Sequence, residues 1–327
     1  MQLTDITVLK TALDWLYQDK TIWLCTILKT YGSAPRPVGA LFVTDGHLRR
    51  GSISGGCLED AFIEMLNDGD FHRSASIFSY GDHLQGEAIA AELPCGGRIR
   101  LLVECLRPSA QVFAHLEQWL QWAQSHFAYV RHVQLQCDGM HIELTTEQAC
   151  LPVVESPDRI EVHYEQVWKC IILGISQVGM SVAQLAIMAG YEVHVCDMRK
   201  QFESSWTYTA EKGGVDVTWI SPDILVDKLA DRRTAVLALA HDPRIDDLGL
   251  MSAFESKAFY LGAMGSKRTS IAREERLKRV CDLSSSDLTR LHAPIGLNIG
   301  SKTPVEIAIA IMADVIRVKN HISLDAL

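Results

Sequence analysis

Hydrophobic residues follow two different patterns along this chain of 327 residues, and the change falls near Trp168. Before that point, stretches with helical spacing stand among short strand-like runs in no regular order. The helical stretches are 3–18, 58–66 and 112–124, and the strand-like runs are 21–30, 40–44, 77–80, 99–106 and 129–136. This pattern predicts a mixed α+β domain over residues 1–145.

From Trp168 onward, strand-like and helix-like segments alternate regularly. The strand-like sequences are CIILG, YEVHVCD, VDVTWI, AVLALAHD and AFYLG, and the helix-like segments are about 177–189, 222–230, 243–255, 267–280 and 305–319. We therefore predict an α/β fold, with a Rossmann-like doubly wound parallel sheet over 167–327. Residues 146–166 lack a strong period and contain Pro152 and Pro157, so we expect a linker there.

The composition is that of a globular protein, with 48% hydrophobic and 22% charged residues, which excludes a disordered or fibrous chain. A formal net charge of −9 argues against nucleic acid or a membrane as partners, because both attract a basic excess. No run reaches the roughly 18 apolar residues of a membrane-spanning helix. Nine cysteines without a CxxC pair or a signal-peptide pattern predict reduced thiols in the cytoplasm. The motifs GxSxG and HExxH are absent, so a serine hydrolase or a zinc protease is not supported.

A glycine fingerprint opens the first helix of the predicted Rossmann-like domain. Gly174 and Gly179 enclose it, and Asp197 follows near the separation at which a Rossmann acid reaches a ribose hydroxyl. The helix start offers free N–H groups to a phosphate. Ser176, however, stands where a glycine usually lets the backbone approach a pyrophosphate. The fingerprint thus indicates the fold firmly, and leaves open a nucleotide-bearing ligand or a purely structural turn.

Two further strands of this domain end in polar or glycine-rich segments, and open α/β sheets bind ligands at the carboxyl ends of their strands. Glycine-rich turns followed by basic residues at a helix start are typical of an anion cradle, although solvated charges are the competing interpretation. The candidate residues at these strand ends are His241, Asp242, Gly262, Gly265, Ser266, Lys267 and Arg268.

Two cysteines of the first domain stand in glycine-rich surroundings. Cys57 follows Gly55 and Gly56 at a helix start, where the helix dipole favours a thiolate that is a nucleophile or a metal ligand. Glu59 and Asp60 in the first turn oppose that effect. The second segment is Cys95, Gly96, Gly97 and Arg98, and Arg36 and Arg50 add positive charge to the same domain. We expect the cysteines in apolar runs to be buried packing residues, namely Cys105, Cys170 and Cys196.

Five segments in this order resemble the XdhC/CoxI family, and together they cover nearly the whole chain. They are GSAPRPVGA (32–40), GSISGGCLED (51–60), CGGR (95–98), YLGAMGSKRT (260–269) and HAPIGLNIGSKTPVEIAIAI (292–311). The resemblance implies an N-terminal XdhC/CoxI domain and a C-terminal Rossmann domain. Members of the family are accessory proteins of xanthine dehydrogenase, carbon monoxide dehydrogenase and related aldehyde oxidoreductases.

The resemblance implies a maturation role without turnover. Such proteins bind the molybdenum cofactor, as molybdopterin or its cytosine dinucleotide form, and protect it while a cysteine desulfurase helps to replace an oxygen on molybdenum by sulfur. They then deliver it to the catalytic chain of the apo molybdenum hydroxylase. The implied contacts are Cys57 to molybdenum or a cofactor sulfur, with Ser33, Arg36 and Cys95 nearby, and Gly296 and Gly300 near the domain interface. We expect the two domains to bind one cofactor, and a homodimer is the default oligomer.

Two other functions compete with this interpretation. An NAD(P)-dependent oxidoreductase would also contain a Rossmann domain, and Asp197 would favour NAD over NADP. A regulatory dinucleotide-binding protein is the third hypothesis. Against the oxidoreductase, Ser176 weakens the fingerprint, and no positioned acid/base pair is evident in the first domain.

Overall fold

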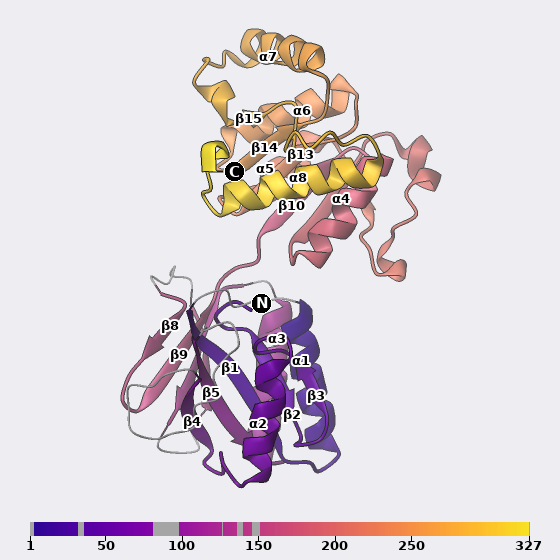
Figure 1. The fold of residues 1–327 in the computed structure, drawn as a ribbon. Coiled ribbons are helices and arrows are strands. Elements are labelled where there is room, and N and C mark those ends of the chain that lie inside the picture. Colours follow the sequence, from indigo (N-terminus) through magenta and orange to yellow (C-terminus); the bar gives the residue numbers. More distant parts are fainter. Residues whose placement is uncertain are drawn as a thin grey trace. The chain divides into compact units, whose positions relative to one another are not determined.

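The structure is a computed structural model and describes residues 3–31, 36–80, 98–125, 127–135, 140–145 and 151–326. For Cys57 and residues 140–144 the description is limited to the backbone. The chain divides into two compact units, Met1–Gln166 and Val167–Leu327 (Figure 1).

The first unit contains a five-stranded antiparallel sheet with helices on both faces. Its strand order is β3-β2-β1-β5-β4. The strands are β1 (Ile22–Tyr31), β2 (Leu41–Thr44), β3 (Arg49–Gly51), β4 (Ala75–Tyr80) and β5 (Arg98–Leu106). Helices α1 (Leu3–Tyr17) and α3 (Ala110–Gln124) pack on one face, and α2 (Cys57–Asn67) packs on the other.

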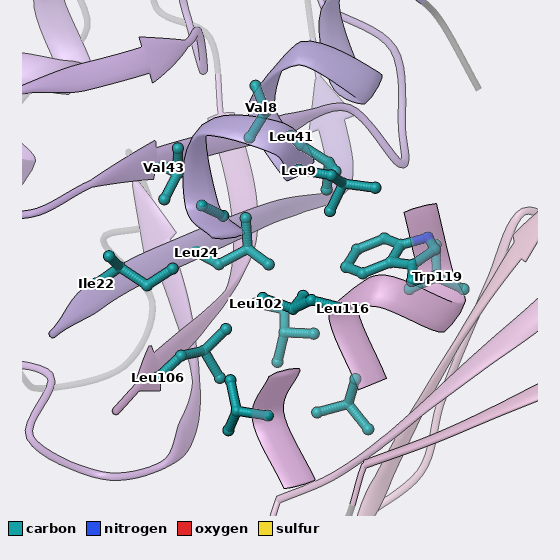
Figure 2. Close-up of a cluster of buried hydrophobic side chains, with 14 of the residues drawn as sticks. Val8, Leu9, Ile22, Leu24, Leu41, Val43, Leu102, Leu106, Leu116 and Trp119 are labelled. Carbon is teal, nitrogen blue, oxygen red and sulfur yellow. The ribbon is translucent and has the colours of Figure 1, made fainter. Parts of the chain in front are cut away.

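Alternation along the strands supplies both cores of this sheet. In β5, Leu102 faces α1 and α3, whereas its neighbours Leu101 and Val103 face α2. The larger core, which includes Leu24 and Trp119, is drawn in Figure 2. Since burying one leucine contributes roughly 2 kcal/mol, this pattern fixes which face each strand residue takes.

A second, four-stranded antiparallel sheet completes the first unit and corrects the predicted linker. Its order is β7-β6-β9-β8. The strands are β6 (Tyr129–Gln134), β7 (Met140–Leu144), β8 (Val153–Glu155) and β9 (Arg159–Tyr164). The linker prediction for 146–166 is therefore wrong, because β8 and β9 lie within it. Ile160, Val162 and Tyr164 alternate with polar residues and are buried in the larger core.

The second unit is a parallel six-stranded sheet of order β12-β11-β10-β13-β14-β15, which confirms the predicted Rossmann-like fold. The strands are β10 (Lys169–Leu173), β11 (Glu192–Cys196), β12 (Val217–Thr218), β13 (Thr234–Ala238), β14 (Tyr260–Ala263) and β15 (Leu291–His292). The sequence pattern did not predict β15, since two residues are too few to show a period.

Helices cover both faces of this parallel sheet. On one face lie α4 (Gln177–Met188) and α8 (Pro304–Lys319); on the other lie α5 (Pro222–Leu229), α6 (Pro243–Glu255) and α7 (Lys267–Cys281). Short 3₁₀ turns cover Lys200–Ser205, Ala210–Lys212, Asp287–Arg290 and Leu324–Ala326. Among the residues that the structure describes, every helix falls short of the length and apolar character that crossing a bilayer requires.

Candidate functional site

Three motif segments of the first unit adjoin strand ends on the same side of its five-stranded sheet. Tyr31, the last residue of β1, pairs with Arg98, the first of β5, and Phe42 near the start of β2 pairs with Gly51 at the end of β3. Because the strands are antiparallel, the segments at 32–40, 51–60 and 95–98 all attach at this end. We call it the motif end. The predicted site residues Ser33, Cys95, Gly96 and Gly97 lie outside the described residues.

Glu59 organises the loop that leads into Cys57. Its carboxylate, only 2% exposed, accepts hydrogen bonds from the N–H groups of Ile53 (2.7 Å) and Gly56 (2.9 Å). The carboxylate also accepts hydrogen bonds from the N–H and hydroxyl of Ser54 (3.1 and 3.0 Å), the hydroxyl of Ser52 (2.6 Å) and the N–H of Gly55 (3.3 Å). One carboxylate thus occupies the centre of the loop, where it takes N–H groups that an external anion would use.

The same contacts fix the charge of Glu59 and the shape of the loop. Burial acts to raise the pKa of Glu59, but the hydrogen bonds from Ser52, Ile53 and Ser54 outweigh it and lower the pKa to about 2. Gly56 has a φ of +144°, which side chains rarely adopt. The loop therefore presents the backbone of Cys57 at the first position of α2 in one fixed conformation.

We expect Glu59→Gln to reduce the free energy of unfolding of the first unit by about 3 kcal/mol at pH 7. A carboxylate whose pKa is lowered on folding stabilises the fold above its unfolded pKa, and that contribution disappears as the pH falls from about 5 towards 2. Urea unfolding at several pH values should show the gap between variant and wild type closing over that window. Asp60→Asn is the control, since Asp60 is exposed and its ion pair with Arg49 lies at the surface. A gap that stays constant with pH would contradict this assignment.

Arg36, a predicted cofactor contact, connects the motif end to α1 through Asp5. Its guanidinium donates to Asp5 at 3.0 Å, and Asp5 also accepts the N–H of Leu41 at 3.1 Å. The Arg36 side chain keeps 16% of its surface exposed, so a contact with a ligand stays a prediction.

The buried cysteines behave as predicted. Cys105, Cys170 and Cys196 are buried, as is Cys25. Burial raises the pKa of Cys170 and of Cys196 to about 12, so both remain thiols at neutral pH. Their role as packing residues is confirmed.

In the second unit, the strand order reverses between β10 and β13, and open α/β sheets bind ligands at such a point. Gly174 follows β10, and Ala240 lies just beyond β13. Gly174 has a φ of +89°, and a Cβ added there would lie 2.2 Å from the Ala240 Cβ. Glycine is therefore required here because two strand-end turns touch.

We expect Gly174→Ala to destabilise the second unit by about 3 kcal/mol, because the new methyl group meets the Ala240 backbone as well as its side chain. Gly190→Ala is a matched control, since Gly190 has a similar φ of +82° and no atom within 4 Å of the added Cβ. The control should cost only about 1 kcal/mol. Urea unfolding of both variants measures the difference, and equal losses would show that the turns can separate.

Ser176 replaces the missing fingerprint glycine with a helix cap. It is the N-cap of α4, and its hydroxyl accepts the N–H of Gly179 at 2.9 Å. The N–H of Ile175 donates to the carboxylate of Asp197 at 2.9 Å. Two donors of the fingerprint turn therefore already bind protein oxygens, which leaves fewer for a pyrophosphate.

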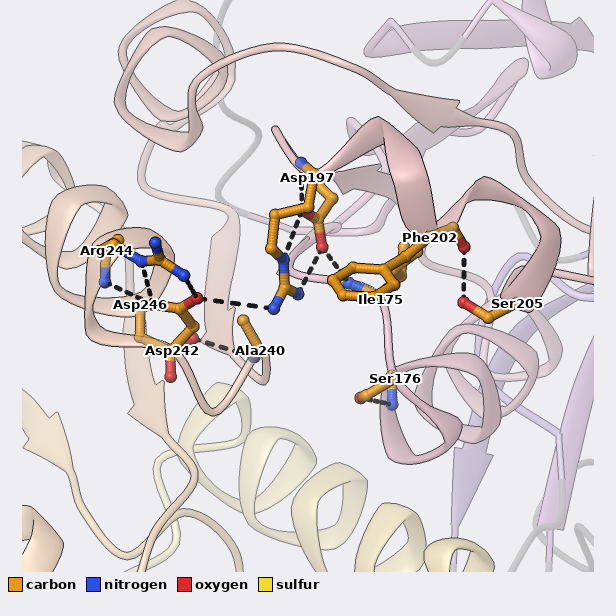
Figure 3. Close-up of polar contacts among 11 residues, drawn as sticks. Ile175, Ser176, Asp197, Phe202, Ser205, Ala240, Asp242, Arg244 and Asp246 are labelled. Atoms are coloured by element: carbon orange, nitrogen blue, oxygen red, sulfur yellow. Dashed lines mark hydrogen bonds and ion pairs between the residues drawn. The ribbon is translucent and has the colours of Figure 1, made fainter.

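Asp197, labelled in Figure 3, is fully buried, and the Arg199 guanidinium binds its carboxylate. Besides the Ile175 N–H, it accepts the Arg199 N–H at 2.8 Å and two guanidinium bonds at 3.0 and 2.7 Å. Burial acts to raise the pKa of Asp197, but these bonds outweigh it and lower the pKa. A ribose hydroxyl would have to displace the Arg199 guanidinium to reach this carboxylate.

The end of β13 lies beside this pair. The Arg199 guanidinium lies 3.7 Å from the carboxylate of Asp242, which caps α6 by accepting the N–H of Arg244. His241 is exposed and has a φ of 56°, an uncommon conformation for a residue with a side chain. The structure thus brings together the ends of β10, β11 and β13 through Ile175, Asp197 and Asp242 (Figure 3).

A buried arginine, which the sequence analysis did not single out, connects the ends of β13 and β14. Arg273 donates to Asp246 and to the carbonyl of Met264, both at 3.1 Å. Asp246 also accepts the N–H of Ala240 at 3.0 Å. Burial raises the pKa of Asp246 to about 6, against the opposing effects of the Ala240 N–H and Arg273. This pair fixes the turn that precedes α7.

Two of the predicted glycines have a packing role. Gly262 is buried within β14, and a Cβ there would lie 2.5 Å from the Ile295 side chain. Close packing therefore accounts for a glycine at this position, and a contact of Gly262 with a ligand stays a prediction. Gly296 has a φ of +89°, and a Cβ there would lie 3.0 Å from the backbone of Ala310 in α8.

The remaining predicted residues of this unit are at or near its surface. Ser266 is the N-cap of α7 and accepts the N–H of Thr269 at 3.2 Å. Gly265, half-buried, precedes it, and Lys267 and Arg268 are exposed in the first turn. Gly300 is exposed, with open space around it.

His292, at the end of β15, was also missed by the sequence analysis. Its Nδ1 lies 3.0 Å from the carboxylate of Asp314, which accepts the Tyr260 hydroxyl at 2.8 Å. Burial acts to raise the pKa of Asp314, but hydrogen bonds from His292, Tyr260 and Arg317 lower it to about 2. Only the folded chain reveals this cluster, because its members come from β14, β15 and α8.

The second unit is thus a Rossmann-type domain in which the chain's own side chains occupy much of the sheet edge where such folds bind ligands. The family model for the XdhC Rossmann domain matches residues 170–315, and the XdhC and CoxI family model matches residues 15–69. The chain belongs to the XdhC/CoxI family.

Relatives of known name match over nearly the full length. The chain is 29% identical to the molybdenum cofactor insertion chaperone PaoD of Escherichia coli, over 96% of this chain and 89% of that protein. It is 22% identical to a Bacillus subtilis protein named as a probable xanthine dehydrogenase subunit, over 96% and 98%. A crystal structure described as a xanthine dehydrogenase from Bacillus halodurans shares the fold, with a TM-score of 0.71, 21% identity and coverage of 99% and 98%.

Proposed function

We propose that this chain binds the molybdenum cofactor as cargo and inserts it into an apo molybdenum hydroxylase of the xanthine dehydrogenase or aldehyde oxidoreductase type. The observation that carries the proposal is that three of the XdhC/CoxI segments adjoin strand ends at the motif end of the first unit. The full-length similarity to the insertion chaperone PaoD supports it. The chain would act by binding and transfer, without turnover of its own.

Cys57 is the proposed contact to molybdenum or to a cofactor sulfur. A thiolate is a soft ligand that suits this metal, and the start of α2 favours the thiolate form. Glu59 would oppose it less than an isolated carboxylate, because the loop N–H groups already compensate its charge. The rigid loop would hold the sulfur at a constant position while cargo is bound.

We further propose that the bound cofactor receives its sulfur while the chain holds it. A docked cysteine desulfurase would carry the sulfur as a persulfide, which a thiol reduces to sulfide. Exchange of the Mo=O oxygen for that sulfide releases water and leaves the oxidation state of molybdenum unchanged. The chain would contribute by binding the cofactor and by keeping oxidants away from it. We propose that it does so in the cytoplasm and as a homodimer.

Co-expression with the cofactor biosynthesis proteins tests the proposal. The chain, purified without oxygen, should contain pterin and molybdenum together, measured as the oxidised fluorescent pterin and by mass spectrometry of the metal. Titration with NADH tests the alternative of an NAD(P)-dependent oxidoreductase. Saturable NADH binding with hydride transfer, and no retained pterin, would overturn the proposed function.

A further inference from the structure

A cleft of about 290 Å³ opens in the first unit beside the ends of three strands. It lies where β1 and β4 end and β5 begins, and β8 contributes one residue. Its lining consists of Lys29, Tyr31, Ser79, Tyr80, Arg98, Ile99, Arg100 and Glu155. Of these residues, the sequence analysis had singled out only Arg98, as part of the Cys95 segment.

The strand register places the polar side chains of this cleft on one face. Arg100 pairs with Lys29 on one side and with Ser79 on the other, and Arg98 pairs with Tyr31. A β-bulge between Ile27 and Lys29 brings this alignment about. This is the face of the five-stranded sheet that packs against α1 and α3. The cleft therefore begins where the apolar residues of that face end.

The cleft is basic although the whole chain carries a net charge of −9. Lys29, Arg98 and Arg100 contribute three positive charges, and Glu155 contributes the one negative charge among the lining residues. Glu155 also fixes Arg100, because the guanidinium donates to it at 2.8 Å and to the Ser79 hydroxyl at 3.0 Å. The arrangement attracts an anion and holds an arginine in place to receive it.

An aromatic ring stands beside these charges. Tyr31 is 48% exposed, and the Lys29 ammonium lies 4.9 Å from the centre of its ring. Exposed aromatic rings next to cations are typical of sites that stack a flat heterocycle and bind its phosphate. At about 290 Å³, the cleft is at the small end of small-molecule sites, which favours one ring with one phosphate over a dinucleotide.

We propose that this cleft binds a small phosphomonoester that carries one flat ring, with Arg98, Arg100 and Lys29 at the phosphate and Tyr31 against the ring. The identity of the occupant rests on the proposed function. If the chain carries the molybdenum cofactor, the cleft binds the part of that cofactor that bears the phosphate. A phosphate site in the first unit is consistent with the fingerprint turn of the second unit, because Ser176 and Asp197 already bind N–H groups that a phosphate would use there.

Calorimetric titration of the full chain with 5′-CMP and with inorganic phosphate tests the cleft directly. We expect saturable binding of both, with CMP at least about tenfold tighter because of the ring. Lys29→Gln with Arg100→Gln should weaken both ligands at least about tenfold. Tyr31→Ala should weaken CMP and leave phosphate unchanged. Lys10→Gln, an exposed charge removal on α1, is the control and should behave as wild type.

Circular dichroism confirms that each variant is folded, and Lys29→Gln alone serves if the double variant unfolds, because Lys29 is exposed. Absence of saturable CMP binding, or equal affinity in wild type and the folded charge variants, would overturn the proposal. The titration contains no molybdenum, so its failure leaves the result of the pterin-retention experiment unaffected.

Discussion

Cys57→Ala is expected to lower the molybdenum content of the purified protein at least about tenfold while the fold stays intact. The structure places Cys57 at the first position of α2, after a loop whose N–H groups bind Glu59. Because this loop is held by hydrogen bonds to Glu59, we expect the fold to survive the loss of the thiol. Molybdenum and pterin are measured in protein co-expressed with cofactor synthesis and purified without oxygen.

Cys281→Ala is the matched control for that experiment. Cys281 ends α7 in the second unit, and its thiol is only partly buried. We expect the control to retain cofactor as the wild type does. Unchanged molybdenum in Cys57→Ala would remove Cys57 from the cofactor site, and equal loss in both variants would indicate a general effect of thiol removal.

Glu104→Gln is expected to reduce the free energy of unfolding of the first unit by about 3–5 kcal/mol. Arg131 is fully buried and binds both oxygens of Glu104 at 2.8 Å. Arg131 also donates to the His115 ring nitrogen at 3.1 Å, and its guanidinium lies 4.0 Å from the centre of the Trp119 ring. Removing the Glu104 carboxylate takes two charge-assisted hydrogen bonds from a fully buried guanidinium, which costs far more than the pair itself contributes.

Urea unfolding measures this loss, and two variants define its cause. Glu104→Leu with Arg131→Met removes both charges and should recover most of the stability. Arg100→Gln, on the same strand, breaks a pair with Glu155 that is partly exposed, so it should cost at most about 1 kcal/mol. A loss in Glu104→Gln no larger than in Arg100→Gln would contradict the role of the buried pair in joining β5 to β6.

The second unit could be predicted from the sequence because its strands are buried on both faces and its helices are well separated. Each strand from β10 to β14 overlaps a segment recognised by its apolar run and extends at most one residue beyond it. The first unit was harder to predict. In β9, single polar residues separate Ile160, Val162 and Tyr164, and two prolines nearby suggested a linker instead of a strand.

The candidate sites show a further limit of sequence reasoning. The separation between Gly174 and Asp197 correctly indicated a strand end, but it could not show that Arg199 would cover the carboxylate. Likewise, Lys29 and Arg100 are far apart in the sequence and become neighbours only through strand register and a β-bulge. Contacts between distant strands are set by packing, and one sequence does not state them.

Transfer of cofactor to an apo molybdenum hydroxylase is the most direct test of the proposed function. The chain loaded with cofactor is mixed with the apo-hydroxylase without oxygen, and molybdenum in each protein is measured with hydroxylase activity over time. The account predicts that molybdenum leaves the chain as the hydroxylase gains metal and activity, faster than from free cofactor at the same concentration. Molybdenum that stays with the chain, or activation no faster than by free cofactor, would contradict it.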